Sequence, residues 1–559
     1  MHKITPILTV FLLSISYVLI GQPCDTILYG NPNVYTLIDG KKLNSITPGC
    51  TICLKGGKYY HIRIDNLHGS AEKPIIIRPE GGNVIIDTNC IYGIRFGGKS
   101  SYLKLSGRTA TEPYAIKILE SDGVGISIDD LSTDIEVEGV EIANTRLAGI
   151  MAKTDPDCSL RAVRDSFALY NLKIHDNYLH DIGFEGMYIG SSFYTGKELN
   201  CNGKDTIVMP HLIFGAEIYN NIVERTGYDG IQVSSVSTDC RINDNRISHD
   251  SYVKQYGQMS GIIIGEGSSC DCYNNKVLKG AGIGIEVHGF GGKKIFNNLI
   301  EDAGRSYKPL TQGAYSKPGI YVAYNLPNPQ NQAYKIFSNT IVNPKSEGIR
   351  FSNINSSNNL IYNNIIVNPG IWHYYDSMGV PPESSYINVN VDVTSDIQHN
   401  FGARNAKTIL FIDSLIGNYR VQASSPAVNT GIDLHPFNVT YDLDYQPRPY
   451  GGQYDLGAYE YFKGQGIEEP PTKKTNFIKS ASFRNTSHEV EIEFEVELMG
   501  SIHIQIFDST GKQVVTSTIK SSNSKSFQLA IPAFPSGTYI LQARYLNLMD
   551  SVKLLKINQ

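Results

Sequence analysis

Residues 216–234 read AEIYNNIVERTGYDGIQVS, and variants of this stretch recur along much of the chain. Each variant has an Asn, an apolar pair, a polar turn, and a Gly followed by a short alternating strand. Such self-similarity is typical of solenoid proteins, in which every repeat is one structural unit. The marker residues of the repeat are Asn177, Asn221, Asn245, Asn275, Asn298, Asn339 and Asn364.

Successive markers are separated by 44, 24, 30, 23, 41 and 25 residues. The short intervals suit one coil of three short strands, and the long intervals suit a coil with an insertion. One coil cannot bury its apolar face alone, whereas stacked coils form a continuous core. A TIM barrel or a Rossmann domain would need helical periodicity between the strands, which this sequence lacks. The sequence therefore predicts an all-β fold dominated by a right-handed parallel β-helix solenoid.

The strand after each Gly alternates with period two, as expected for a strand that buries one face. We expect its apolar residues to point into the core and the marker Asn side chains to hydrogen-bond from coil to coil. The expected inward residues are Ile126, Ile150, Met187, Ile231, Ile262, Ile285, Ile320 and Ile349, followed two positions later by Ile128, Ala152, Ile189, Val233, Ile264, Val287, Val322 and Phe351.

The amino-terminal end has the features of a secretory signal peptide over residues 1–21. Lys3 supplies a positive charge, residues 7–20 are apolar, and Gly21 is the small residue before the expected cleavage point. No later apolar stretch is long enough to span a membrane, so no span is predicted in the mature chain. The formal net charge is −5, and no basic stripe stands out, so nucleic acid is not an expected partner.

The nine cysteines all lie in the first half of the chain. Cys50 and Cys53 have the spacing of a redox or zinc pair, but no second pair or His follows at zinc spacing. In an exported protein we expect structural disulfides and one unpaired thiol. Cys240 and Cys270 each precede their marker Asn by five residues, so they occupy equivalent positions on adjacent coils. At a separation of about 4.8 Å they could form a disulfide or stack without a bond.

Two segments resemble known β-helix proteins. Residues 46–87, ITPGCTICLKGGKYYHIRIDNLHGSAEKPIIIRPEGGNVIID, resemble the opening of secreted pectate-lyase-like proteins, including the chondroitinase-B and alginate-lyase-like group, although Cys50 replaces the usual Asp. Residues 424–461, with SSPAVNTGIDL and YDLGAYEY, resemble the closing segment of bacterial surface β-helix proteins. The resemblance implies one β-helix domain over residues 22–462. It does not supply the chemistry, because the catalytic signatures of neither the polygalacturonase-like nor the alginate-lyase-like group are complete.

The end of the chain changes in style. Residues 463–475, KGQGIEEPPTKKT, read as a linker, and residues 476–559 carry alternating strands that predict a small β-sandwich. The stretches IFDSTGKQVV, FPSGTYIL and VKLLKIN resemble the C-terminal sorting domain of the type IX secretion system of Bacteroidota. This resemblance implies the type IX machinery as a partner and, after Sec export, a secreted or outer-surface location. A carbohydrate-binding sandwich is the alternative for this segment.

The outward residues of the aligned strands define one face of the predicted solenoid. Insertions at 153–168, 191–212, 249–260, 304–318 and 324–333 flank this face, and insertions on one side of a repeat protein usually mark its binding side. They predict a walled groove that would hold a polysaccharide. One outward row holds Arg95, Ser127, Met151, Tyr188, Gln232, Ile263, Glu286, Tyr321 and Arg350; a second holds Asp129, Lys153, His288 and Ser352; and a third, just before the Gly, holds Glu185, Asp229, Ser260 and Glu347.

Two reactions suit such a face. In a glycoside hydrolase, one carboxylic acid protonates the leaving oxygen while a second carboxylate attacks or activates water. Glu185 and Asp229 share a register on successive coils, and their closeness would raise one pKa. In a lyase, a basic group such as Lys254, Lys153 or Arg305 removes the proton next to a uronate carboxylate, which Arg or Ca²⁺ neutralises.

The sequence thus predicts a secreted monomer that binds polysaccharide and degrades it as a lyase or glycoside hydrolase. The alternative is a non-catalytic adhesin or glycan-binding protein, because solvated strand faces are polar by default. No protein-bound metal is assigned, and Ca²⁺ is expected only for a lyase. The predicted catalytic residues are Glu185, Asp229, Glu286, His288 and Lys254, and the predicted substrate-binding residues are Tyr188, Gln232, Lys153, Arg305, Tyr307, Tyr321 and Arg350.

Overall fold

The computed structural model describes residues 23–43, 45–307, 316–324, 333–370, 386–462, 478–483, 489–508, 513–531, 537–545 and 548–556. The predicted signal peptide (1–21) and the predicted linker (463–475) lie outside the described residues. Among the described residues, no helix has the length and apolar character needed to cross a membrane.

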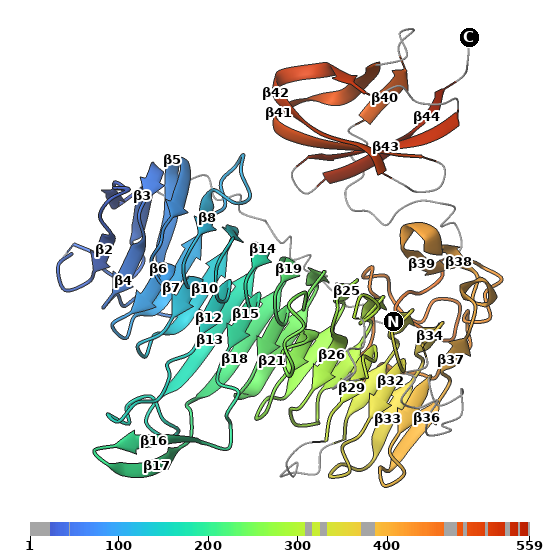
Figure 1. The fold of residues 1–559 in the computed structure, drawn as a ribbon, viewed down its shortest axis with the longest axis horizontal. Helices are drawn as coiled ribbons and strands as arrows, with labels where there is room; N and C mark the ends of the chain where they lie inside the picture. The colour runs from blue at the N-terminus through green and yellow to red at the C-terminus, as the bar shows by residue number, and fades with distance from the viewer. Residues whose placement is uncertain are drawn as a thin grey trace, which may run out of the picture.

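One parallel sheet takes a single strand from each coil, in chain order. Figure 1 shows these coils stacked in sequence from the blue amino-terminal strands to the yellow and orange ones. The twelve strands are β2 (Thr36–Asp39), β4 (Ile62–Asp65), β6 (Tyr92–Gly97), β9 (Val124–Ile128), β12 (Ile150–Ala152), β15 (Met187–Ile189), β20 (Ile231–Val233), β23 (Ser260–Ile264), β26 (Ile283–Val287), β29 (Ile320–Val322), β32 (Ile349–Phe351) and β35 (Ile387–Val389).

A second parallel sheet of 23 strands supplies the other two sides of the coils. Its strands are β1 (Thr26–Leu28), β3 (Thr51–Tyr59), β5 (Ile75–Asp87), β7 (Ser101–Ser106), β8 (Ile116–Glu120), β10 (Thr133–Glu138), β11 (Val140–Ala143), β13 (Ala168–His175), β14 (Tyr178–Ile182), β18 (Leu212–Tyr219), β19 (Ile222–Thr226), β21 (Val236–Asn243), β22 (Arg246–Ser248), β24 (Cys270–Tyr273), β25 (Lys276–Leu278), β27 (Lys294–Phe296), β28 (Leu299–Glu301), β30 (Lys335–Phe337), β31 (Thr340–Val342), β33 (Asn359–Tyr362), β34 (Ile365–Val367), β36 (Ser395–Gln398) and β37 (Phe401–Ala403).

The core of the solenoid is the one expected from the alternation of the strands. All sixteen predicted inward residues are buried, with at most 3% of their surface exposed. They pack with inward residues of the 23-stranded sheet into one continuous apolar cluster. Parallel sheets that bury their inner faces in this way account for the apolar residues at every second position.

The marker asparagines form a ladder at the bend between two strands of each coil. Each side-chain amide donates to the side-chain oxygen of the next marker at 2.9–3.1 Å, from Asn177 through to Asn364. The predicted ladder is therefore confirmed, and Asn400 adds a further rung at 2.9 Å. Each oxygen also accepts a backbone N–H, and each amide also donates to a backbone carbonyl, as Asn245 does to Ile218 at 2.9 Å. The ladder thus satisfies backbone groups that the bend would leave buried and unpaired.

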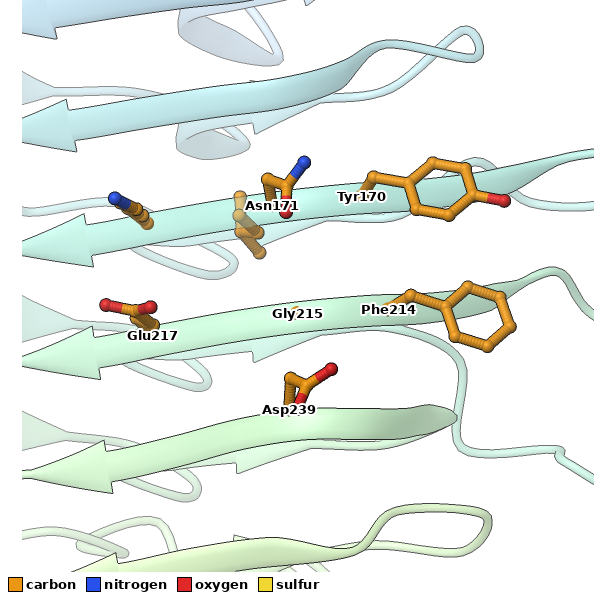
Figure 2. Close-up of a pocket in the computed structure, with 8 residues that line it drawn as sticks. Tyr170, Asn171, Phe214, Gly215, Glu217 and Asp239 are labelled. Atoms are coloured by element: carbon orange, nitrogen blue, oxygen red, sulfur yellow. The ribbon is translucent and has the colours of Figure 1, made fainter. Parts of the chain in front are cut away.

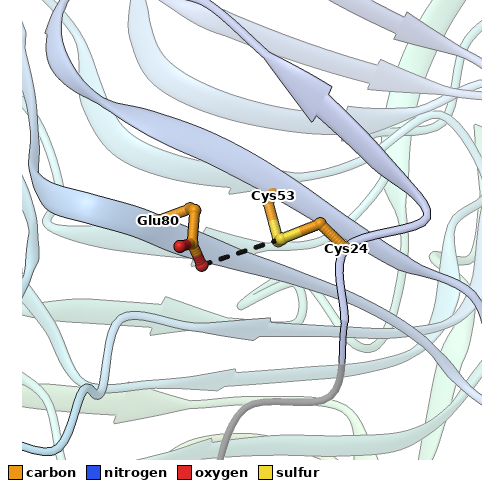
Figure 3. A group of neighbouring side chains, drawn as sticks. All are labelled: Cys24, Cys53 and Glu80. Carbon is orange, nitrogen blue, oxygen red and sulfur yellow. Dashed lines mark hydrogen bonds between the residues drawn. A yellow bond between two sulfur atoms is a disulfide. The ribbon is translucent and has the colours of Figure 1, made fainter.

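Three disulfides link neighbouring parts of the solenoid. Cys240 and Cys270 are bonded, with Cα atoms 4.5 Å apart, so the disulfide alternative is correct. Cys53 is bonded to Cys24 rather than acting with Cys50 (Figure 3). The Glu80 carboxylate lies 3.7 Å from the Cys24 sulfur. The third bond joins Cys158 to Cys201.

The expectation of one unpaired thiol is wrong, because three cysteines are free. The free cysteines are Cys50, Cys90 and Cys272. Cys272 pairs in register with Ile242 and Ile295 on the adjacent coils, so no second sulfur faces it.

The closing segment packs against the outer surface of the 23-stranded sheet. Its Leu456 and Ala458 join a cluster with Leu299 and Ile365 of that sheet. The Arg448 guanidinium, which is fully buried, contacts the Glu460 carboxylate at 3.0 Å and donates to Asn297 Oδ1 at 2.8 Å. This part of the chain also contains β38 (Phe411–Asp413), β39 (Asn418–Val421) and the 3-10 helices η2 (Ala406–Thr408), η3 (Ser414–Ile416) and η4 (His435–Phe437).

The carboxy-terminal strands form a separate five-stranded sheet with antiparallel pairings. Its described core includes Val490, Ile504 and Leu541. The structure describes one sheet, so the predicted β-sandwich remains a prediction. The strands are β40 (Ile478–Phe483), β41 (Glu489–Asp508), β42 (Gln513–Ala530), β43 (Gly537–Tyr545) and β44 (Leu548–Lys556).

Replacing Asn245 by Ala tests the ladder. The substitution leaves the Asn221 amide and the Ile218 carbonyl without one of their buried partners, so we expect a loss of stability on the order of 2 kcal/mol. Chemical denaturation of the full chain measures it, with exposed Asn33→Ala as the matched control. Equal denaturation midpoints for the two variants would show that the ladder does not stabilise the fold.

Candidate functional site

The outward positions of the 12-stranded sheet form the row that the repeat predicted. Backbone pairing places them on successive coils in the predicted order. The row is not uniformly exposed, however: Gln232 is only 3% exposed and Ile263 8%, whereas the Glu286 side chain retains 15%. The row runs Arg95, Ser127, Met151, Tyr188, Gln232, Ile263, Glu286, Tyr321 and Arg350.

A chain of hydrogen bonds leads from the buried row of carboxylates to this outward row. Asp229 is fully buried, and its Oδ1 accepts the backbone N–H of Ser260 at 2.7 Å. The Ser260 hydroxyl donates to Glu286 Oε2 at 2.5 Å. The other Glu286 oxygen lies 2.9 Å from His288 Nε2, and the His288 side chain is 33% exposed. Of these groups, His288 therefore reaches solvent most fully.

The environments of Asp229 and Glu286 shift the pKa values of these two acids in opposite directions. Burial, followed by the negative charges of Glu185 and Glu286, raises the pKa of Asp229 well above its usual range. Burial also raises the pKa of Glu185. Burial acts to raise the pKa of Glu286 too, but the hydrogen bonds from His288 and Ser260 outweigh it and lower the pKa. Neighbouring carboxyls whose pKa values are shifted apart are a recurring feature of active sites.

The pKa of His288, which is paired with Glu286, is shifted upward. Burial acts to lower the pKa of His288, but the hydrogen bond and charge of Glu286 outweigh it, so the net shift is upward. Holding Nε2 against a carboxylate also fixes the ring orientation and the tautomer. In the neutral form, Nε2 carries the proton and Nδ1 is the nitrogen able to accept one.

Lys317, which the repeat pattern did not indicate, completes the cluster. This lysine is 3% exposed, and burial lowers its pKa to about 8, against the opposing charges of Glu286 and Asp229. A further buried acid, Asp250, has its pKa raised to about 6 by burial. Neither residue occupies an outward strand position, so the alternation of the strands carried no signal for them.

Several predicted binding residues gather beyond one end of the strands. The Tyr307 ring has the Lys345 ammonium 4.9 Å and the Lys317 ammonium 5.3 Å from its centre. Arg305 donates to the backbone carbonyls of turns, at 2.7 and 2.9 Å. Lys254 is exposed; after burial, its charge and that of Arg305 lower the pKa of Lys345. These groups make a cationic cluster next to the acids.

Two more predicted pairs lie along the row. The Lys153 ammonium is 4.6 Å from the centre of the Tyr188 ring and 2.8 Å from the Asp155 carboxylate. The Arg350 guanidinium is 5.4 Å from the centre of the Tyr321 ring, which pairs in register with Glu286. Aromatic hydroxyls and cations therefore lie on both sides of the acids.

The predicted groove remains a prediction, but the described parts of two insertions are tied to one another and to the solenoid. The disulfide Cys158–Cys201 ties the insertion 153–168 to the hairpin of β16 (Lys197–Cys201) and β17 (Lys204–Val208). Tyr194, in the second insertion, contacts Phe290 edge to face at 5.6 Å. The insertions 304–318 and 324–333 lie partly outside the described residues. A cavity of about 340 Å³ lies on the 23-stranded sheet instead.

Within the described part of the chain, metal-ligand spacing occurs away from this face. One such group is Glu136, Glu138 and His175, where the Lys104 ammonium already contacts both carboxylates at 2.5 and 2.9 Å. The other is the disulfide pair with Glu80. The Ca²⁺ expectation for a lyase therefore stays a prediction.

Comparisons with known families agree with this architecture. Residues 211–387 match the family model of the right-handed β-helix region, and residues 486–556 match that of the secretion system C-terminal sorting domain. The chain therefore carries a right-handed β-helix, and its sorting domain directs export through the type IX system to the cell surface or the medium.

One solved structure that is similar is the enzymatically active domain of tailspike protein 2 of Bacteriophage CBA120. It is 10% identical, over 93% of this chain and 72% of that chain, with a TM-score of 0.23. At this score the fold assignment rests on the strand pairings and the family match. A search of curated proteins finds no match.

Replacing Asp229 by Asn tests the electrostatics of the buried acids. An acid whose folded pKa is raised resists ionisation, so folding is disfavoured above the unfolded pKa of about 3.9. Asn keeps the acceptor for Ser260 but cannot ionise, so we expect a higher melting temperature at neutral pH. The gain should vanish in acid, where Asp229 is protonated in both states. Exposed Asp87→Asn is the control, and equal gains from both variants, or none from Asp229→Asn, would contradict the shift.

Proposed function

We propose that this protein binds an acidic polysaccharide along the outward face of the 12-stranded sheet and cleaves it by β-elimination. The observation that carries the proposal is the Glu286–His288 pair, held by Ser260 and reaching solvent beside the Tyr321 and Arg350 side chains. This set offers a base, an acid and a cation on adjacent coils. An elimination needs these three and no further reactant.

His288 is the base. Its Nδ1 removes the proton from the carbon next to a uronate carboxylate, while Glu286 holds Nε2–H and stabilises the imidazolium that forms. The electron pair forms a carbon–carbon double bond as the bond to the neighbouring glycosidic oxygen breaks. That oxygen takes a proton, and the product is a chain with an unsaturated uronate at its new end.

Tyr321 and Arg350 complete the reaction. The Tyr321 hydroxyl protonates the leaving oxygen, and this role is supported by the pairing of its strand in register with that of Glu286. Arg350, next in the row and 29% exposed at its side chain, pairs with the uronate carboxylate and makes the neighbouring proton more acidic. The buried Asp229 and Lys317 act as positioning residues that set the charge around Glu286.

The cationic cluster and the route of export support an acidic polymer as the substrate. Lys254 and Arg305 each lie close enough to Lys345 to lower its pKa, and such a cluster attracts a negatively charged chain. Lys153 over Tyr188 extends the binding row in the opposite direction. Type IX export delivers the protein to the compartment in which such polymers occur.

The test is to incubate the full mature chain with alginate, polygalacturonate and chondroitin. New ultraviolet absorbance from an unsaturated uronate is the expected result. New reducing ends without that absorbance would replace elimination by hydrolysis. Binding without cleavage of any of these polymers would favour the non-catalytic glycan-binding alternative.

Replacing His288 by Gln should lower kcat/KM at least about 100-fold, because the general base is lost. The exposed His68→Gln, on the other sheet, should leave the rate unchanged. In the intact protein the rate should rise with pH over a range centred above the ordinary histidine pKa of about 6.5, since only neutral His288 accepts a proton and its pKa is raised. Absorbance measured across this range checks both statements, and a flat profile would remove His288 from the base role.

Removing the Tyr321 hydroxyl tests the role of the general acid separately from that of the base, His288. Tyr321→Phe keeps the ring beside Arg350 but removes the proton donor, so kcat should fall by about 10- to 1,000-fold with little change in KM. Tyr29→Phe, at an exposed site just after β1 of the other sheet, is the matched control. An unchanged kcat for Tyr321→Phe would assign the leaving-group proton to another donor.

A further inference from the structure

A cavity of about 340 Å³ opens on the outer surface of β13, β18 and β21, on a different sheet from the proposed reaction. This volume is within the range of small-ligand sites, roughly 300–1,000 Å³. Figure 2 shows its lining, with Tyr170 and Phe214 at one side and Asn171, Gly215 and Asp239 toward the middle.

The hollow exists because one of three adjacent coils has a glycine, and so no side chain, at the same position of a bend. Asn171, Gly215 and Asp239 occupy the same left-handed bend on successive coils, with φ of 49°, 82° and 54°. Asn and Asp tolerate this conformation and place polar side chains there. Gly215 places none, so a gap remains between the Asn171 amide and the Asp239 carboxylate. A Cβ at Gly215 would meet Asn171 Oδ1 at 3.4 Å, which is an ordinary contact.

Two aromatic rings form one wall of the hollow. Tyr170 and Phe214 are register partners on adjacent coils, with ring centres 5.5 Å apart and ring planes within 20°. In Figure 2 the rings lie side by side and both turn a face toward the viewer, so together they offer a flat apolar surface. Tyr170 is 47% exposed.

This exposure contrasts with the aromatic residues further along the same sheet. Phe296, Phe337 and Tyr362 lie beneath the closing segment, in a cluster with Leu434 and Tyr454. No part of the closing segment contributes to the lining of the hollow at Tyr170 and Phe214. Tyr170 is thus exposed and Phe214 half-buried, and a contiguous apolar surface of this kind is a feature of binding surfaces.

The charges around the hollow balance. Lys173 and Glu217 are register partners, and Arg241 lies 3.8 Å from the Glu217 carboxylate. Asn171 donates to Asp134 at 2.7 Å, which leaves its side-chain oxygen as an acceptor facing the gap. The site therefore offers hydrogen-bond acceptors and a donor without a net positive charge.

We propose that this hollow is a second, non-catalytic carbohydrate site that takes a pyranose unit of a neutral glycan. The apolar face of a pyranose stacks on the Tyr170 and Phe214 rings, as amphipathic groups do on aromatic surfaces. Its hydroxyls fill the gap at Gly215 and donate to Asn171 and Asp239. This proposal and the proposed reaction have in common only that both ligands are carbohydrates. The proposal is tested by binding and not by cleavage.

Calorimetric titration of the full chain carrying His288→Gln tests the proposal with cleavage suppressed. The probes are cellohexaose, xylohexaose and mannohexaose, with hexagalacturonate as the acidic comparison. We expect measurable binding of at least one neutral probe. Gly215→Asn fills the hollow with a residue that its own neighbours use, and Phe214→Ala removes half of the platform. Each should raise Kd at least tenfold, whereas Tyr29→Ala, which removes an exposed ring elsewhere, should leave Kd unchanged.

A thermal melt of the Gly215→Asn variant guards against loss of folding as the cause. A side chain on this left-handed backbone is strained, but Asn tolerates the conformation, so we expect the midpoint to fall by no more than a few degrees. Three outcomes overturn the proposal: binding of none of the neutral probes, neutral binding that Gly215→Asn and Phe214→Ala leave unchanged, or Gly215-dependent binding of hexagalacturonate alone. Loss of the cleavage activity in the parent chain would bear on the proposed reaction and not on this site.

Discussion

The solenoid depends on the hydrogen bonds between marker asparagines at one bend of each coil. A bend in a buried strand leaves backbone N–H and C=O groups without hydrogen-bond partners from the neighbouring strands. Leaving these groups unpaired destabilises the fold by more free energy than most single interactions contribute. The asparagine side chain supplies both a donor and an acceptor, so each rung satisfies the coil before it and the coil after it. Because every rung has the same geometry, the register of one coil is passed to the next.

A constant register turns separated residues into rows. Glu286, Tyr321 and Arg350 are 35 and 29 residues apart, yet they occupy the same position on adjacent coils. The same repetition places Glu185 and Asp229 next to each other, where burial raises the pKa of both. Buried acids with raised pKa values destabilise the fold at neutral pH, so a contribution to stability does not explain their presence.

The outer surface of the solenoid is modified where the repeat is broken. The hairpin inserted after β15 is tied by a disulfide to the preceding insertion, while the closing segment covers aromatic rings on the other sheet. At Gly215 the break is a missing side chain in a row of left-handed residues, and the result is a cavity. In each case the regular coils form the scaffold, and the irregular position gives that part of the surface its distinctive side chains or shape.

The sequence by itself determined the parts of this protein that repeat. The alternation of Ile and polar residues set the inward rows, and the Asn markers set the coil boundaries, because period and burial are local properties of a strand. The tertiary structure alone decided which outward residues stay accessible. Asp229 and Gln232 lie on the predicted face but are buried, with 0% and 3% of their surface exposed. It also decided that Lys317, from an insertion, joins the acids, and that Asn400 extends the ladder. Burial, and with it each pKa, depends on chain segments distant in sequence, which no local pattern encodes.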